Sequence, residues 1–130
     1  MKNYNISEAE WKIMQILWER KNLTIKEITA SLVDTGWSYS TIKTLVLRLT
    51  KKGAIGADTT IGNFKYYPIA NRNECRLKET KSFLNRIYGG SVKMLIASLA
   101  NESELSESET ARLMELIDKM EGEKGNEDII

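Results

Sequence analysis

Apolar and polar positions alternate with a helical period over much of this 130-residue chain. The clearest case is the stretch from residue 37 to residue 53, where apolar side chains recur every three or four positions, namely Ile42, Leu45, Val46 and Leu49. Ser38 is placed to cap the start of this helix, because its hydroxyl can accept a hydrogen bond from a first-turn N–H. Gly53 can adopt the left-handed conformation that often ends a helix. The pattern therefore predicts an amphipathic helix.

The opposite face of this helix carries hydroxyl groups and positive charges but no carboxylate. It comprises Ser40, Lys43, Thr44, Leu47, Arg48 and Lys51, with Tyr39 at its edge. A solvated helix face usually mixes charges of both signs, whereas a face without acids is suited to lie against a polyanion. We interpret it as a DNA recognition helix. Leu47 has two alternative places, either against a thymine methyl or sugar or turned toward the core.

Two shorter helices are predicted before this one. Residues 7–10 and 24–27 are both capping-box sequences, in which a hydroxyl and a glutamate satisfy the free N–H groups of a helix start. The first helix runs to about Arg20 and the second to about Val33, with Ile25, Ile28, Leu32 and Val33 facing inward. Leu23 between them can form a minimal edge strand. A tight turn at residues 34–36 completes a helix-turn-helix, although similar helix pairs occur in proteins that do not bind DNA.

A β-hairpin is predicted directly after the recognition helix. Residues 55–60 and 64–69 read as strands around a short turn. Tyr66 and Tyr67 must point to opposite faces, so one packs inward and the other is exposed. Pro68 indicates a strand end or an edge strand, because it has no N–H to donate. A hairpin in this place is the wing of a winged helix. It offers Thr60, Asn63 and Lys65 to a phosphate backbone, or else it only covers the core.

Three further apolar-striped helices are predicted beyond residue 72. Asn73 can cap the first, which runs to about Tyr88, while Ser91 and Ser106 can cap the other two. Leaving their apolar stripes in water would forfeit several kcal/mol, at ~25 cal/mol per Å². We expect a second copy of the chain to cover them, the alternative being that they fold back onto the preceding domain. The expected organisation is a DNA-binding domain at 1–72, a helical dimerisation region at 73–121 and a disordered tail at 122–130.

The net charge of +1 hides a strong asymmetry along the chain. Residues 1–93 hold 16 Lys and Arg against 8 Asp and Glu, whereas residues 94–130 hold 3 against 10. A basic first part suits contact with nucleic acid and an acidic second part suits exclusion from it, although acidic C-terminal helices are also common in proteins that bind no DNA.

Composition narrows the function further. The chain has no histidine and one cysteine, which argues against a His-based catalytic triad, an internal disulfide or a cysteine-cluster metal site. We expect no enzyme activity, no metal and no cofactor. Cys75 is interpreted as a structural thiol, with a redox switch as the alternative. No uncharged run exceeds eight residues, far short of the ~20 that span a bilayer, and the start lacks a signal-peptide core. A cytoplasmic location is expected.

Several motifs together resemble the penicillinase-repressor (BlaI/MecI-type) family. They are Ser7-x-x-Glu10-Trp11, the run from Trp37 to Leu45, Arg48-Leu49, Lys51-Lys52-Gly53, Tyr66-Tyr67 and Tyr88-Gly89-Gly90. The resemblance covers about residues 4–120. It implies a winged-helix homodimer that represses transcription at a palindromic operator. It also implies, as partners, a receptor or protease of an antibiotic-sensing system that relieves repression.

The motifs and the resemblance together suggest two sets of site residues. The expected DNA contacts are Ser38, Tyr39, Ser40, Thr41, Lys43, Thr44, Leu47, Arg48, Lys51, Lys52, Asn63 and Lys65. The expected dimer contacts are Leu84, Ile87, Tyr88, Val92, Leu95, Ile96, Leu99, Leu113, Ile117 and Met120.

Two departures from the family pattern bear on regulation. The β-lactam-regulated members carry a scissile Asn-Phe bond in the short helix, where this chain has Ser98-Leu99. Induction by that cleavage is therefore not expected here. The related copper-responsive repressors carry C-terminal cysteine pairs that this chain lacks. The sequence thus predicts a DNA-binding repressor with an unassigned inducing signal, and a winged-helix module that binds proteins without DNA is the alternative.

Overall fold

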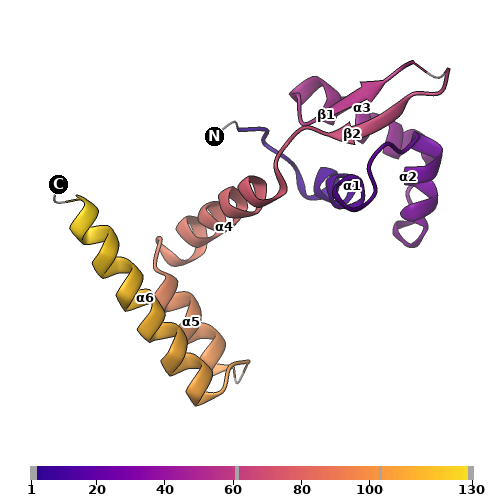
Figure 1. The fold of residues 1–130 in the computed structure, drawn as a ribbon. Coiled ribbons are helices and arrows are strands. Elements are labelled where there is room, and N and C mark those ends of the chain that lie inside the picture. The colour runs from indigo at the N-terminus through magenta and orange to yellow at the C-terminus, as the bar shows by residue number, and fades with distance from the viewer. Residues whose placement is uncertain (1–2, 61, 103, 129–130) are drawn as a thin grey trace. The chain divides into compact units, whose positions relative to one another are not determined.

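The computed structural model describes residues 3–60, 62–102 and 104–128, with side chains described as far as Met120. Three helices, a β-hairpin and three further helices follow one another along the chain (Figure 1). This mainly helical fold with a small hairpin confirms the predicted fold class. Two compact units are distinguished, one ending at Arg76 and the other beginning at Leu77. Among the described residues, no helix combines the length and apolar character needed to cross a bilayer.

Both predicted capping boxes form at the starts of the first two helices. In α1 (Glu8–Glu19) the Glu10 N–H donates to the Ser7 hydroxyl at 3.1 Å, and the Ser7 N–H donates back to the Glu10 carboxylate at 2.8 Å. Thr24 and Glu27 make the same reciprocal pair in α2 (Ile25–Ser31). These bonds satisfy N–H groups that a helix start otherwise leaves free.

One prediction for α2 was wrong. Val33 was expected to face inward at the end of this helix, but α2 ends at Ser31 and the Val33 side chain is 78% exposed. Leu32 leaves helical geometry, with φ −113° and ψ 26°, and a short 3-10 helix (Val33–Thr35) follows. The change of helix type turns Val33 away from the face that buries Ile28.

The recognition helix forms as predicted, as α3 (Tyr39–Lys52). The Thr41 N–H donates to the Ser38 hydroxyl at 3.2 Å, and Gly53 ends the helix with φ 82°, a conformation that costs glycine little. Its buried residues are Ile42, Leu45, Val46 and Leu49, as the apolar period indicated.

The hairpin pairs β1 (Ile55–Asp58) with β2 (Lys65–Pro68) in antiparallel register, with Ala57 opposite Tyr66. Both predictions for the two tyrosines are confirmed, because Tyr66 is buried and Tyr67 is exposed. The Leu23 backbone exchanges hydrogen bonds of 2.8 and 3.1 Å with the Tyr66 backbone, which adds the predicted minimal edge strand. The wing is therefore a two-stranded hairpin to which Leu23 adds a single bridge at Tyr66.

The core of the first unit lies between α1, α2, α3 and the hairpin, which surround it in Figure 1. Its most buried side chains, each less than 2% exposed, include Ile13, Met14, Leu17 and Ile28. Trp18 packs at the edge of this core and donates from its indole N–H to the Ala70 carbonyl at 2.9 Å. The predicted inward faces of three helices thus meet in one cluster.

The fourth helix, α4 (Arg72–Tyr88), begins one residue before the position we expected to cap it. The Glu74 N–H donates to the side-chain oxygen of Asn71 at 3.0 Å, so Asn71 takes the capping role that we assigned to Asn73. The Gly89-Gly90 pair follows with φ values of 58° and 89°, which ends the helix as predicted.

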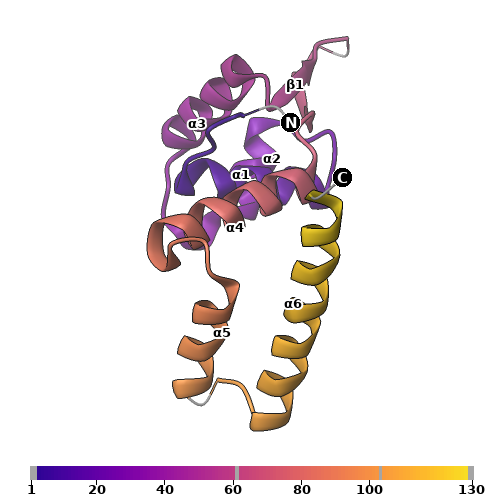
Figure 2. The same cartoon turned by 90° about the vertical axis from the view of Figure 1, so that its left-hand side faces the viewer.

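In the second unit, α5 (Val92–Asn101) and α6 (Glu107–Asp128) pack side by side as a helical hairpin (Figure 2). Ser91 caps α5, and Ser106 and Glu109 form a capping box at α6, as predicted. The backbone of α6 continues helically to Asp128, past residue 121, after which we had expected a tail.

Candidate nucleic-acid interface

Apart from Lys52, the predicted contact residues of α3 lie on its exposed side. Ser40, Thr41, Lys43, Thr44 and Arg48 are exposed, while the residues between them in the helical period are buried against α1, α2 and β1. Ser38 and Lys51 are exposed at the two ends. Because the apolar face fixes the helix on the core, the hydroxyl-bearing and basic face is held outward.

Three hydroxyl groups at this face are already partly used within α3 and its N-cap. The Thr44 hydroxyl donates to the Ser40 carbonyl at 3.1 Å, and the Ser38 and Thr41 hydroxyl oxygens lie 3.1 Å apart. A hydroxyl whose proton is engaged still has an acceptor lone pair. Thr44 is therefore oriented to accept a hydrogen bond from the edge of a base or a water molecule rather than to donate one.

Lys52 is the one residue of the predicted DNA contacts that the structure places elsewhere. Its ammonium group donates to the Glu10 carboxylate at 2.5 Å and to the Asn5 carbonyl at 2.9 Å. Glu10 is only 1% exposed, so this is an ion pair with a buried partner. The charge of Lys52 is thus paired inside the domain, whereas Lys51 beside it is exposed without such a partner among the described contacts.

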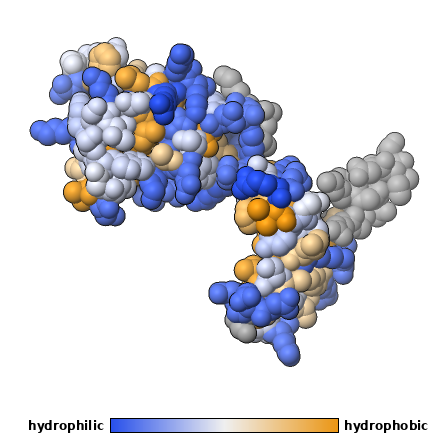
Figure 3. Space-filling view, turned by 180° about the vertical axis from the view of Figure 1, so that it is seen from behind, coloured by the Kyte–Doolittle hydropathy of each residue, from blue (hydrophilic) through white to orange (hydrophobic). Residues whose placement is uncertain are grey.

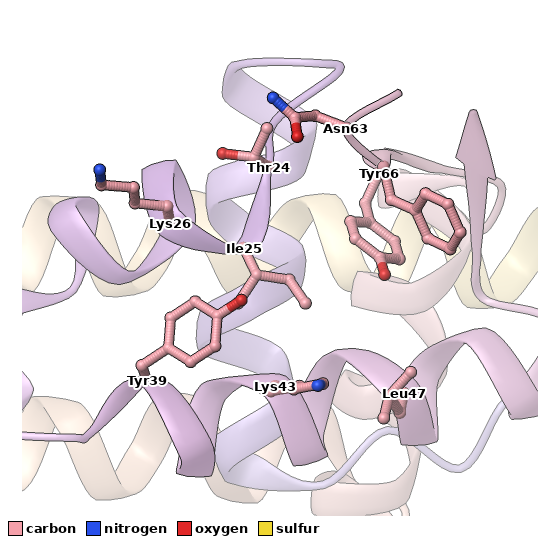
Figure 4. A pocket seen from close by; sticks show the side chains of 9 residues that line it. Thr24, Ile25, Lys26, Tyr39, Lys43, Leu47, Asn63 and Tyr66 are labelled. Carbon is pink, nitrogen blue, oxygen red and sulfur yellow. The ribbon is translucent and has the colours of Figure 1, made fainter. Parts of the chain in front are cut away.

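A groove of about 440 Å³ lies between the start of α2, α3 and the hairpin (Figure 4). Tyr39, Lys43 and Leu47, four residues apart on α3, form one wall, and Asn63, Phe64 and Tyr66 of the hairpin form another. Leu47 is 50% exposed, which favours the outward of its two predicted places. The groove brings Tyr39, Lys43, Leu47 and Asn63 together from two separate parts of the predicted set.

Sequence reasoning missed two residues that line this groove, Thr24 and Lys26 at the start of α2. Thr24 was recognised only as a helix cap. Lys26 is exposed and adds a second positive charge to the groove, whose lining includes no carboxylate. The available signal was their place in a helix start that precedes a recognition helix, since such starts attract anions.

The polar residues of the wing differ in whether their hydrogen-bonding groups are already used within the chain. The Thr60 hydroxyl and N–H both donate to the Asp58 carboxylate, at 2.7 and 3.0 Å, and these bonds lower the pKa of Asp58. Lys65 is half-buried, and its charge contributes to the lowered pKa values of both Asp58 and Glu27. Thr60 is thus occupied within the turn, and Asn63 at the exposed tip is the freer wing contact.

One Asn-Phe bond does occur in the chain, between Asn63 and Phe64. It lies in the exposed turn of the wing and not in α5. The short helix α5 has Ser98-Leu99 where the β-lactam-regulated members were expected to carry that bond.

The predicted dimer contacts form a second surface, in the unit that begins at Leu77. Ile87, Val92, Leu99, Leu113 and Met120 are 36–66% exposed in the single chain, and apolar residues interrupt its hydrophilic surface (Figure 3). Leu84, Tyr88, Leu95 and Ile117 are half-buried. Ile96 differs, because it is 5% exposed and already packed within the chain. Most of the predicted interface is therefore open in one protomer.

A helix-turn-helix with a β-hairpin wing and an outward basic helix defines a winged-helix DNA-binding protein. The family model described as penicillinase repressor matches residues 6–119. The methicillin resistance regulatory protein MecI of Staphylococcus aureus (strain N315) is 33% identical, covering 91% of this chain and 97% of MecI. The chain belongs to the penicillinase repressor family, which makes it a transcriptional repressor and not an enzyme.

Solved structures agree with this assignment over the first unit. The DNA-binding domain of the repressor BlaI is 34% identical with a TM-score of 0.50, and the match covers 57% of this chain and 93% of that domain. The monomeric form of Bacillus licheniformis BlaI, solved in complex with the blaP half-operator, matches with the same values. The wing and recognition helix therefore belong to a fold that holds operator DNA in a relative.

Proposed function

We propose that this chain is a homodimeric repressor that inserts α3 into the major groove of each half of a palindromic operator. The observation that carries the proposal is the exposed, acid-free face of α3 on a closed core. Lys43, Arg48 and Lys51 draw the protein onto DNA by releasing counterions. Ser40, Thr41 and Thr44 contact base edges and phosphates, and Asn63 and Lys65 of the wing contact the backbone.

Pairing of the C-terminal helices supplies the second recognition helix. The open apolar side chains of α4, α5 and α6 support this role, because a second copy can cover them without unfolding the first unit. A two-fold dimer presents two α3 helices on one side of the duplex, separated by one or more turns of about 34–36 Å. Bound in the cytoplasm over a promoter, the dimer blocks transcription without any chemistry of its own.

The regulated process is proposed from the names of relatives. They are regulators of methicillin resistance and of penicillinase, which supports a role in the response to cell-wall antibiotics. A receptor or protease of an antibiotic-sensing system is the proposed partner that relieves repression. Because α5 carries Ser98-Leu99, cleavage at an Asn-Phe bond in that helix is not part of the proposal.

DNA binding is tested by fluorescence anisotropy with DNA from upstream of the chain's own gene, over a series of salt concentrations. We expect affinity to fall steeply with salt, by a slope of about 0.9 for each phosphate neutralised. The matched control is Lys12→Gln on α1, which removes a positive charge outside the α3 face. Salt-independent binding, or none, would instead favour the protein-interaction module.

The palindrome is tested with the protected operator itself. Inserting about five base pairs between its half-sites turns one half-site to the opposite side of the duplex, since a turn holds 10–10.5 base pairs. We expect binding to weaken strongly, and an insertion of about ten base pairs to restore the facing of the two half-sites. Equal affinity for all three spacings would argue against a rigid dimer.

A further inference from the structure

Glu10 is the buried charged residue of the first unit, among the side chains that the structure describes. One of its oxygens, Oε1, accepts hydrogen bonds from the Ser7 N–H at 2.8 Å and from the Lys52 ammonium at 2.5 Å. Its other oxygen, Oε2, is buried with no hydrogen-bond partner in the described part of the chain. A buried carboxylate is costly unless it is paired, so Lys52 is what makes this charge tolerable.

The pair joins the end of α3 to the start of α1 and the backbone just before it, more than 40 residues earlier in the sequence. Lys52 is the last residue of α3, Glu10 lies in the first turn of α1, and the Lys52 ammonium also donates to the Asn5 carbonyl at 2.9 Å. Asn5 has φ 53°, a left-handed conformation that asparagine tolerates better than most residues. The backbone before α1 is thus shaped so that its carbonyl meets the end of α3.

The ion pair of Glu10 and Lys52 supplies a directional constraint on α3 that the apolar core does not. Contacts of Ile42, Val46 and Leu49 hold α3 on the core, but apolar packing has no direction and permits a helix to slide or rotate slightly. Hydrogen bonds to a buried charge have fixed lengths and angles. They fix the end of α3 against the start of α1, and with it the angle at which Arg48 and Thr44 are presented.

We propose that Glu10 and Lys52 are positioning residues for operator recognition, acting through the placement of α3 and touching no DNA themselves. The inference rests on the proposed function. It differs from the sequence expectation in one measurable way: Lys51 meets a phosphate, whereas the adjacent Lys52 does not.

The two lysines provide a matched test. Lys51→Gln, Lys52→Gln and Glu10→Gln are compared with the unmodified full chain by anisotropy, on operator DNA and on random DNA, across salt concentrations. Lys51→Gln should weaken binding to both DNAs and lower the salt slope by about 0.9 for each phosphate that is no longer neutralised. Lys52→Gln and Glu10→Gln should leave the slope unchanged and weaken operator binding on the order of tenfold, with little change on random DNA.

Two further variants separate positioning from simple loss of stability. Lys52→Arg keeps the charge and donors, and should bind the operator within about twofold of the unmodified chain. The double variant Glu10→Gln/Lys52→Gln should be no weaker than either single one, because both changes break the same ion pair. Circular dichroism establishes that each variant is folded. Lys52→Gln leaves the Glu10 carboxylate buried without its partner, so Glu10→Gln and the double variant carry the test if Lys52→Gln is not folded.

The outcomes are distinguishable. A lower salt slope for Lys52→Gln, equal to that of Lys51→Gln, would show that Lys52 contacts phosphate and would overturn the inference. Operator affinity unchanged in folded Lys52→Gln would overturn it as well. In both cases the proposed repressor function stands, because the unmodified chain binds. Absence of DNA binding by the unmodified chain overturns both proposals.

Discussion

The two units of this chain differ in how completely they bury their own apolar side chains. In the first unit, fifteen apolar residues from α1, α2, α3, the hairpin and the segments that join them form a closed cluster. In the second, among side chains described between residues 77 and 120, Ile96 alone reaches that degree of burial. The helical periods of the two units look alike in sequence. The difference teaches that similar helical periods can close a core in one unit and leave most apolar side chains open within the single chain in the other.

The two units also differ in where their exposed apolar residues lie. Those of the first unit include Tyr39, Leu47 and Phe64, which line the groove beside the recognition helix. Those of the second unit include Leu99, Leu113 and Leu116 on the helical hairpin. Burying one such leucine yields about 1.5–3 kcal/mol. The first set lies beside the proposed DNA-binding face, and the second lies on the helices that we propose to pair in the dimer.

The sharpest test of the comparison truncates a leucine in each unit. Leu49→Ala removes a side chain that is fully buried, and should lower the free energy of unfolding of the first unit by about 2–5 kcal/mol. Leu116 is 50% exposed in the single chain. In the monomer of this chain, Leu116→Ala should therefore change the free energy of unfolding by less than about 0.5 kcal/mol. Urea denaturation measures both. Equal losses would mean that the second unit has a closed core after all.

Assembly should depend on the second unit alone. Leu99→Asp places a charge in the proposed dimer seam, at a position exposed enough to tolerate it in a single chain. We expect dimer dissociation to increase by about 100-fold or more, roughly 3 kcal/mol. Sedimentation velocity measures it. Ala97→Asp adds the same charge at an exposed position of the same helix outside the proposed contacts, and should remain dimeric.

Arg48→Ala tests whether operator binding can be weakened without a change in stability or dimerisation. It should weaken operator binding by about 1–3 kcal/mol if the guanidinium contacts a base. Because Arg48 is exposed and outside both cores, unfolding and dimerisation should not change. Anisotropy, urea denaturation and sedimentation on one preparation separate the three effects. Unaltered operator affinity would remove Arg48 from the interface.

The smallest expected effect is the response to acid. Burial acts to raise the pKa of Glu10, but hydrogen bonds from Lys52 and Ser7 outweigh it, and the pKa lies below its ordinary value of 4.5. A lowered pKa in the folded state adds stability at pH above 4.5, and this stability is lost as the pH falls through the folded value. Unfolding free energy measured from neutral pH to below 4.5 should therefore fall less in Glu10→Gln than in the unmodified chain. Parallel curves would contradict this.

Local signals in the sequence determined most of the fold. Helix starts at Ser7, Thr24, Ser38, Ser91 and Ser106 were predicted because a capping hydroxyl acts on N–H groups only two or three residues away. The exposed face of α3 was predictable for a similar reason, since its apolar period fixes which side is buried. The hairpin followed from two short strand patterns around a turn.

Sequence reasoning missed features of the structure that depend on distant contacts or on competition between local ones. Lys52 looked like part of a basic run, and its partner Glu10 lies 42 positions earlier. Val33 continued an apolar period, but a 3-10 turn replaced the last turn of α2. Asn71 and Asn73 are equally good caps by composition. The groove of Thr24 and Lys26 is made by three elements and has no signature in any one of them.

The backbone pairing of Leu23 with Tyr66 has a consequence for how the wing works. It ties β2, at the residue after Lys65, to the connection between α1 and α2, so the hairpin is held close to its turn as well as at its root. Little conformational entropy remains to be lost there when a nucleic-acid strand arrives. The orientation of the wing strands on the first unit is thus fixed before any partner is present.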